Sequence, residues 1–257
     1  MKSPSIRKIK LVVGYDGTAF AGWQRQKHDR TIQGEIEKAL CRMTQEDISL
    51  HGAGRTDAGV HAEKMVAHFS TSSAVSCEDF QRGLNSILPG AIRIYDTTEV
   101  DHSFHSRFSA TGKRYRYTVF TGRIQPPEAR LYSLHVATDL KLERIRDCLK
   151  AVEGTHDFAS FENSGTRDKT KTIGRGAVRT IFAAELTQDG DHQITFHFTG
   201  DGFLRNMVRN LVGTLLEVGR GKLSTEDFTT ILHAKNRSAG GPTAPPHGLF
   251  LEQVFYD

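Results

Sequence analysis

"AVRTIFAAELTQDGDHQITFHFTG", residues 177–200, contains two runs in which apolar, β-branched and aromatic residues alternate with polar ones. An alternation of period two is typical of strands with one buried face. The two runs meet at Asp189-Gly190, and Asp-Gly between alternating runs is a strong signal for a tight hairpin turn. The stretch therefore predicts an antiparallel β-hairpin in the second half of the chain.

The segments around this hairpin alternate between strand and helix patterns. In the second half we predict strands at 114–120 and 247–256 and helices at 139–154, 203–219 and 224–235, the last with a Ser/Thr–Glu capping signature. In the first half we predict strands at 9–15, 48–55, 64–70 and 91–100 and helices at 32–43, after an N-cap at Thr31, and 77–88. Each half therefore has the order β-α-β-β-α-β, with 224–235 as an extra helix before the last strand of the second half.

This order predicts an α+β fold made of two tandem β-α-β-β-α-β units of the RRM-like or ferredoxin-like kind. We expect antiparallel sheets joined around a central cleft. The expected domains are 1–104, an N-terminal α+β domain, and 105–257, a C-terminal α+β domain. A long segment with little periodicity, roughly 160–176, is predicted to be a loop.

The composition is that of a soluble globular protein, with 37% hydrophobic and 25% charged residues among 257. No window approaches the ~20 apolar residues of a membrane span, and the N-terminus does not resemble a secretory signal, so we expect a cytoplasmic protein without membrane contact. Cys41, Cys77 and Cys148 lie far apart, which argues against a disulfide framework and a zinc knuckle.

Basic residues are clustered rather than interspersed, although the net charge is only +4. Residues 101–125 hold five Lys or Arg against Asp101, and residues 166–181 hold five against Asp168. The first cluster is interleaved with aromatic residues in "KRYRYTVF". One such cluster would be read as a solvated surface, but two favour a polyanionic partner such as nucleic acid.

The stretch "GAGRTDAGVHA", residues 52–62, surrounds one acidic residue, Asp57, with small residues. Its glycine spacing fits neither a dinucleotide fingerprint nor a Walker A loop. Asp57 could simply close an Asx turn. Alternatively, Arg55 and the nearby glycines could bring a planar ligand close to its carboxylate. His61 and His68 lack further ligands at suitable spacing, so no metal site is predicted.

The stretch "GRTDAGVHA" resembles the catalytic motif of tRNA pseudouridine synthases of the TruA family. Four further blocks resemble the same family in the same order: "YDGTAFAGWQRQ" (15–26), "SFHSRFSATGKRYRY" (103–117), "DGFLRNMVRNLVGTLLEVGRGK" (201–222) and "GPTAPPHGLFL" (241–251). The likeness runs the full length of the chain.

This resemblance implies an enzyme that isomerises uridine to pseudouridine at positions thirty-eight to forty of the tRNA anticodon arm. The family works as a homodimer without cofactor or metal. Asp57 matches the essential aspartate, and Arg55 matches an arginine that replaces the flipped nucleotide. Tyr115 matches a tyrosine packed against the target base, and Arg209 matches an arginine that pairs with the aspartate. Lys113, Arg114 and Lys169 are expected to bind the RNA backbone.

One departure from the family pattern is visible before "MVRN", where Arg205-Asn206 replaces a pair that is commonly aromatic or histidine. It leaves the catalytic set intact and concerns RNA contacts of that helix. The carboxylate of Asp57 could attack C1′, add to C6 or remove the 2′ proton, and the residues do not choose among these routes.

Two other functions fit part of the pattern. A non-catalytic RNA-binding protein with two RRM-like domains would use the basic clusters and aromatics, but "RYRYTVF" lacks the RRM consensus. A carboxylate glycosidase would need a second acid near Asp57 and would leave both basic clusters unexplained.

Overall fold

The computed structural model describes residues 6–163 and 175–257. In these ranges the chain forms five α-helices and ten strands, and most strand pairs are antiparallel, which confirms the α+β class. The chain divides into two compact units, residues 1–111 with 250–257, and residues 112–249. The sequence pattern places the division at 104/105 and assigns residues 250–257 to the second half, whereas in the structure these residues return to unit 1.

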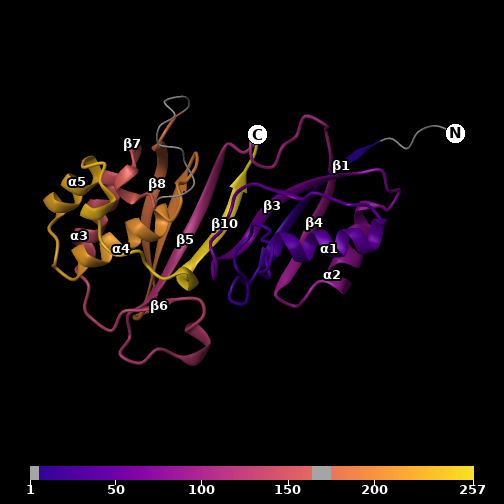
Figure 1. The fold of residues 1–257 in the computed structure, drawn as a ribbon. Helices are drawn as coiled ribbons and strands as arrows, with labels where there is room; N and C mark the ends of the chain where they lie inside the picture. The colour runs from indigo at the N-terminus through magenta and orange to yellow at the C-terminus, as the bar shows by residue number, and fades with distance from the viewer. Residues whose placement is uncertain (1–5, 164–174) are drawn as a thin grey trace. The chain divides into compact units, whose positions relative to one another are not determined.

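Unit 1 is a sheet with the strand order β4-β1-β3-β10, in which β2 also pairs with β3 (Figure 1). Its elements are β1 (Arg7–Tyr15), α1 (Ile32–Thr44), β2 (His51–Gly52), β3 (His61–Thr71), α2 (Cys77–Ile87), β4 (Ile92–Val100) and β10 (Leu249–Phe255). Strand β1 is antiparallel to both β3 and β4, whereas β10 pairs in parallel with β3 at His61 and Ala62. The first six of these elements follow the order predicted for the first half.

The two helices of unit 1 begin at side-chain caps and cover its core. Thr31 accepts a hydrogen bond from the Gly34 amide (3.3 Å), as predicted, and Ser76 accepts one from Asp79 (3.1 Å). Each bond satisfies a backbone donor that the first helical turn leaves unpaired. The core contains, among others, Ile9, Leu11, Val13, Ile36, Leu40, Phe69, Phe80 and Leu84, all fully buried.

The strand predicted at 48–55 is reduced to the two residues of β2, because helix side chains bind the backbone just before it. Glu37 accepts a hydrogen bond from the Leu50 amide (2.9 Å), and Gln33 donates to the Leu50 carbonyl oxygen (3.0 Å). These polar groups of α1 take the place of a neighbouring strand, so the extended segment makes few ladder bonds.

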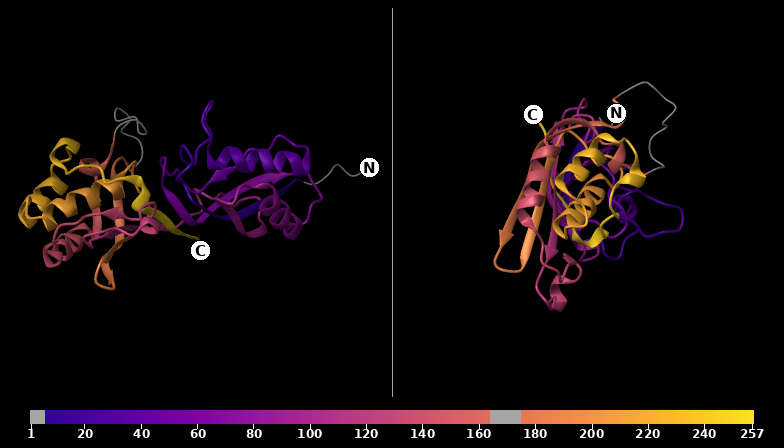
Figure 2. Two further views of the ribbon diagram at one scale, coloured as in Figure 1. Left: turned by 90° about the horizontal axis from the view of Figure 1, so that it is seen from below. Right: turned by 90° about the vertical axis from the view of Figure 1, so that its left-hand side faces the viewer.

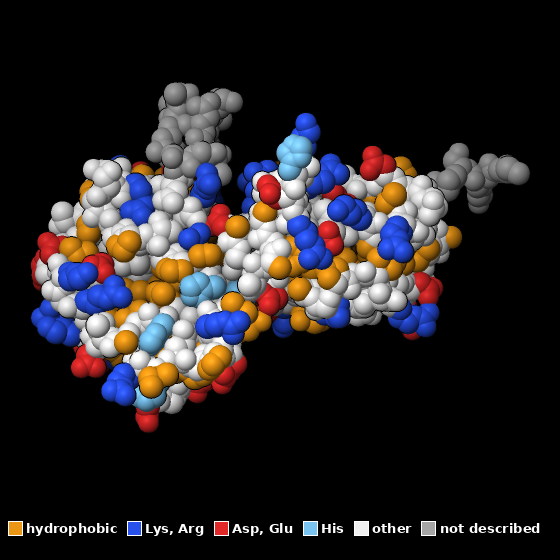
Figure 3. Space-filling model, turned by 60° about the horizontal axis from the view of Figure 1, so that its bottom comes forward, with side chains coloured by type: hydrophobic (Ala, Val, Ile, Leu, Met, Phe, Trp, Pro, Cys, Tyr) orange, Lys and Arg blue, Asp and Glu red, His pale blue; other side chains and the backbone are white. Residues whose placement is uncertain are grey.

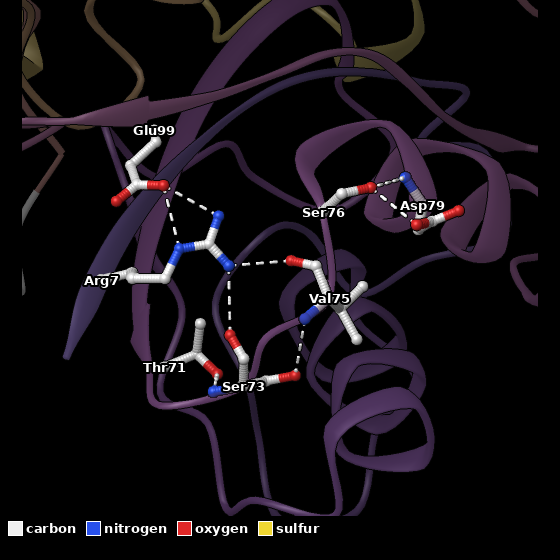
Figure 4. Close-up of polar contacts among 7 residues, drawn as sticks. All are labelled: Arg7, Thr71, Ser73, Val75, Ser76, Asp79 and Glu99. Carbon is white, nitrogen blue, oxygen red and sulfur yellow. Dashed lines mark hydrogen bonds and ion pairs between the residues drawn. The ribbon is translucent and has the colours of Figure 1, made fainter. Parts of the chain in front are cut away.

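Arg7 fixes the turn that connects β3 with α2 (Figure 4). Its guanidinium binds the Glu99 carboxylate at 2.8 and 2.9 Å and donates to the carbonyl oxygens of Ser73 (3.1 Å) and Val75 (2.8 Å). One side chain on β1 thus joins β4 to the entry of α2, whose first turn Ser76 caps. This explains how α2 is positioned over the sheet.

Unit 2 is a sheet with the strand order β5-β9-β8-β7, and β6 pairs with β5. Its elements are β5 (Gly112–Phe120), β6 (Leu134–His135), α3 (Leu142–Val152), β7 (Gly154–Asp157), β8 (Val178–Asp189), β9 (Gln193–Gly200), α4 (Met207–Gly219) and α5 (Thr225–His233), with 3-10 turns at Pro127–Ala129, Ala159–Phe161, Arg237–Ala239 and Pro246–Gly248. The predicted hairpin is confirmed, since Asp189 pairs with Gln193 and Gly190 has φ +63°. Its tip projects away from the helices of the unit (Figure 2).

Two helix starts in unit 2 differ in detail from the sequence pattern. Helix α4 begins at Met207 rather than at 203, because Asn206 has a left-handed backbone (φ 59°) and cannot continue a helix. Helix α5 has a capping box as predicted, but Ser224 pairs with Asp227 rather than with a glutamate. The short strand β7 has no recognisable strand pattern in the sequence.

Three histidines of unit 1 lie together beside the segment that follows β4. The ring centroid of His68 lies 5.2 Å from that of His51 and 4.7 Å from that of His105. Burial lowers the pKa of His68 to about 4, and the charges of His105, His51 and Lys8 act in the same direction. The Nδ1 atom of His68 accepts a hydrogen bond from the Ser106 amide (3.2 Å), which requires the neutral ring.

We expect this cluster to make unit 1 sensitive to acid. A histidine with a folded-state pKa of about 4 and an unfolded value of about 6.5 stabilises the fold fully above pH 6.5, and the contribution is lost as the pH falls from 6.5 through 4. Urea denaturation between pH 7 and pH 4.5 should show falling stability, with a smaller fall in His68→Phe. An equal fall in that variant would remove His68 as the cause.

Candidate functional site

The turn that carries Asp57 lies between β2 and β3 in unit 1, and main-chain hydrogen bonds close it. The Val60 amide donates to the Asp57 carbonyl oxygen (3.2 Å), and the Gly59 amide donates to the Phe20 carbonyl oxygen (3.4 Å). Gly59 has φ +76°, a conformation that side-chain-bearing residues rarely adopt. These two bonds hold the backbone on the C-terminal side of Asp57.

The side chains of this turn differ in exposure. Arg55 and Ala58 are exposed, Gly54 and Asp57 are half-buried, and Ala53 is fully buried. Arg55 therefore reaches solvent next to a carboxylate that is partly shielded. The small size of Ala53 serves core packing rather than access to Asp57.

The segment Tyr15–Trp23 packs against the same turn. Trp23 is almost fully buried, and its amide donates to the Thr56 carbonyl oxygen (3.1 Å). A Cβ on Gly52 would lie 2.6 Å from the Trp23 ring, so only glycine fits beside it. Trp23 is therefore a core residue that packs against the turn and holds it in place.

Tyr115 and Arg209 belong to unit 2. Tyr115 lies on β5 opposite Phe198 of β9, is 8% exposed, and contacts Phe203 edge to face at 4.9 Å. Lys113 and Arg114 precede it on β5 and are half-buried. The strand thus places a nearly buried phenol directly after two cations. Lys169 lies outside the residues that the structure describes.

Arg209 is positioned on α4 by the segment that leads to β10. Its Nε donates to the Ala244 carbonyl oxygen (2.7 Å), and the Ala244 amide donates to the Arg209 carbonyl oxygen (3.1 Å). A Cβ on Gly213, one turn further on, would lie 1.7 Å from the Pro242 carbonyl oxygen. The absence of a side chain at Gly213 therefore lets this segment lie directly on α4.

A buried polar network supports the same region. Asn210 is fully buried and donates to the Phe161 carbonyl oxygen (2.8 Å) and to Asn163 (3.1 Å). Its own Oδ1 accepts from Arg237 (3.0 Å) and Thr243 (2.7 Å). Burial lowers the pKa of Arg237. No sequence pattern predicts this network, because its members are far apart in the chain, Asn210 and Asn163 by 47 positions.

The charge of Arg209 acts on two neighbouring groups of unit 2. Burial raises the pKa of Tyr117, which donates to the Pro245 carbonyl oxygen (2.8 Å), and the Arg209 cation opposes this rise. Burial lowers the pKa of His247, and Arg209 lowers it further. Both groups are therefore neutral near pH 7, and Arg209 is the cation among these three residues.

Surface charge is mixed on the face drawn in Figure 3, where Lys and Arg side chains lie on both units with Asp and Glu between them. Part of the second basic cluster is neutralised, because Arg175 binds Asp201 through two hydrogen bonds (2.8 and 3.1 Å).

In the described parts of the chain, no group of three or more His, Cys, Asp or Glu could hold a metal ion. Nor is any helix there long and apolar enough to cross a membrane.

Comparison with known proteins agrees with this residue pattern. The family model for tRNA pseudouridine synthases matches residues 11–109 and 149–257. The tRNA pseudouridine synthase A 1 of Desulfotalea psychrophila is 57% identical over 251 residues, which are 98% of this chain and 100% of the relative. The tRNA pseudouridine synthase A of Geobacter sulfurreducens is 44% identical over 249 residues, 97% and 99% of the two chains. That of Ligilactobacillus salivarius is 43% identical over 254 residues, 98% and 97%.

The chain belongs to the tRNA pseudouridine synthase family. The matched ranges include Asp57 and Arg55 in the first segment and Arg209 in the second, whereas Tyr115, Lys113 and Arg114 lie between the two.

Proposed function

We propose that the protein isomerises uridine to pseudouridine at positions thirty-eight to forty of the tRNA anticodon arm, with Asp57 as the essential group. The observation that carries the proposal is the "GRTDAG" turn, which presents one partly shielded carboxylate beside an exposed arginine, within a chain of this family. Both features suit an enzyme that must reach a base held inside an RNA stack.

The chemistry fits residues that act without a redox cofactor. The N1–C1′ bond of uridine breaks, C5 joins C1′, C5 loses its proton and N1 gains one, so no electrons are transferred overall. An ionised Asp57 serves by attack on C1′, by addition to C6 or by removal of the 2′ proton. Arg209, a permanent cation with a bidentate donor set, is the group that we propose as the partner of this carboxylate.

Two further residues provide for base flipping. Extrusion of a base costs a few kcal/mol, and stacking on an aromatic ring returns about 1–3 kcal/mol. Tyr115 provides the ring, and Arg55 fills the gap that the base leaves. The backbone contacts to Ala244 that position Arg209 support a fixed geometry on the unit 2 side.

The proposal extends to the architecture and the assembly. The two units are tandem RRM-like modules around a cleft, the working form is a homodimer, and the enzyme acts in the cytoplasm on tRNA without a metal. The first six elements of unit 1, in the order β-α-β-β-α-β with β1 between β3 and β4, support the modular part.

The direct test is to incubate unmodified tRNA transcripts with the purified protein, without added cofactor, and to map pseudouridine along each transcript. We expect new pseudouridine within the anticodon arm at positions thirty-eight to forty and nowhere else. Tight tRNA binding without any pseudouridine would instead indicate a non-catalytic RNA-binding protein. Pseudouridine at another position would contradict the assigned target.

Lys113, Arg114 and Lys169 should together contribute to affinity by neutralising phosphates. Replacing all three by Gln should weaken tRNA binding and flatten its salt dependence, by roughly 0.7–0.9 in the log–log slope for each phosphate that is no longer neutralised. Titrations at several salt concentrations measure the slope. Lys38, Lys150 and Arg82, which are exposed and paired with neighbouring acids on their own helices, provide the matched triple control. An unchanged slope in the test variant would show that these side chains do not touch phosphate.

A further inference from the structure

Thr56, the residue directly before Asp57, is bound through both its side chain and its backbone. The Thr56 Oγ1 and Tyr15 Oη atoms are 2.8 Å apart, and the two residues are 8% and 5% exposed. The Trp23 amide donates to the Thr56 carbonyl oxygen (3.1 Å). Thr56 is therefore held by one hydrogen bond at its side chain and one at its carbonyl oxygen.

The same segment, Tyr15–Trp23, approaches the turn so closely that glycine is required at two positions. A Cβ on Gly22, which has φ +90°, would lie 2.5 Å from the Thr56 carbonyl oxygen and 3.0 Å from the Asp57 carbonyl carbon. A Cβ on Gly17 would lie 2.0 Å from the Val60 carbonyl oxygen. The segment therefore touches the turn on both sides of Asp57.

We infer that the Tyr15–Thr56 hydroxyl pair is a positioning device for Asp57, and this inference rests on the proposed function. Asp57 shares a peptide bond with Thr56, so a shift of Thr56 moves the carboxylate with it. A misplacement of about 1 Å at a reacting group can cost about 10²-fold in rate. Because neither hydroxyl is proposed to contact the RNA, loss of the pair should change turnover and leave tRNA affinity unchanged.

Either hydroxyl can donate in this pair, so removal of either one breaks the buried bond between them. Tyr15→Phe and Thr56→Val should therefore have similar effects. The double variant should be no slower than either single variant, because both changes remove the same bond. Thr56→Ser keeps the hydroxyl and should retain most of the rate.

The experiment measures single-turnover rate, tRNA dissociation constant and melting temperature for these four variants of the full chain. We expect the rate to fall about 10- to 100-fold in Tyr15→Phe, Thr56→Val and the double variant. Thr56→Ser should stay within about threefold of wild type, and all dissociation constants within about twofold.

Two controls remove comparable hydroxyls elsewhere in unit 1. Tyr256→Phe loses a bond to the Ser106 carbonyl oxygen (2.6 Å), and Thr71→Val loses one to Glu46 (2.6 Å). Both should lower the melting temperature without slowing turnover. If the test variants behave like these controls, or if their effects add in the double variant, the positioning role is wrong. If Asp57→Asn still turns over, Asp57 is not the essential group, and the part of the proposed function on which this inference rests fails, whatever the Tyr15 and Thr56 variants show.

Discussion

Asp57→Asn should abolish pseudouridine formation, by on the order of 10³-fold or more, while the fold and tRNA binding persist. Asparagine has nearly the same size and shape, and the turn is closed by backbone hydrogen bonds that do not depend on the carboxylate. Its neutral amide cannot attack C1′, add to C6 or remove the 2′ proton. All three routes therefore predict the same loss.

Single-turnover assays measure the rate of pseudouridine formation, and tRNA titrations measure the affinity for tRNA. Asp101→Asn is the matched control, since Asp101 is exposed in the same unit and its oxygen accepts from the Ser103 amide (2.8 Å), a bond that asparagine can keep. Asp57→Glu extends the carboxylate by one methylene and should also be strongly impaired if position matters. Turnover near wild type in Asp57→Asn would remove Asp57 from the mechanism.

Asn210→Leu should destabilise the protein by about 3 kcal/mol, the largest stability effect we expect, because it removes a fully buried amide that bonds four other groups. The Phe161 carbonyl oxygen loses its amide donor, and Arg237 and Thr243 each lose the acceptor Oδ1 of Asn210. One of the broken bonds is donated by the guanidinium of Arg237, and hydrogen bonds to charged groups contribute more than those of a neutral pair.

Denaturant unfolding measures this loss, and Asn85→Ala is its control. The Asn85 side chain donates to the Ile94 carbonyl oxygen (2.8 Å) and accepts from the Ile94 amide (2.9 Å). Asn85 is half-buried, so water can reach these groups. We expect a cost of about 1 kcal/mol there. Equal costs for the two variants would show that burial of the Asn210 network adds nothing.

Sequence patterns predict the structure correctly where an element depends only on residues next to it in the chain. The hairpin at Asp189-Gly190 and the N-cap at Thr31 depend on neighbouring residues, and both are confirmed. The strand predicted at 48–55 depends instead on side chains of α1 that bind the Leu50 backbone. No local pattern reveals such an interaction.

The same distinction applies to the site. The predictions of Asp57, Arg55, Tyr115 and Arg209 rest on likeness to a family, because each alone would more often be a turn, surface or sheet residue. The pairing of Thr56 with Tyr15 joins positions 41 apart in the sequence and has no periodic signature. Only the folded chain brings these hydroxyls together.

The parallel pairing of β10 with β3 has a consequence for biosynthesis. His61 lies four residues after Asp57, and Phe250 pairs with it and stacks on its ring, with the ring centroids 4.5 Å apart. The ribosome adds Phe250 only after all of unit 2 has been made. In a nascent chain that ends at residue 249, we expect a protease to cleave this part of β3 more readily than in the full chain. If both chains resist the protease equally at β3, this expectation is wrong. The turn that carries Asp57 would then mature only after unit 2 has been synthesised.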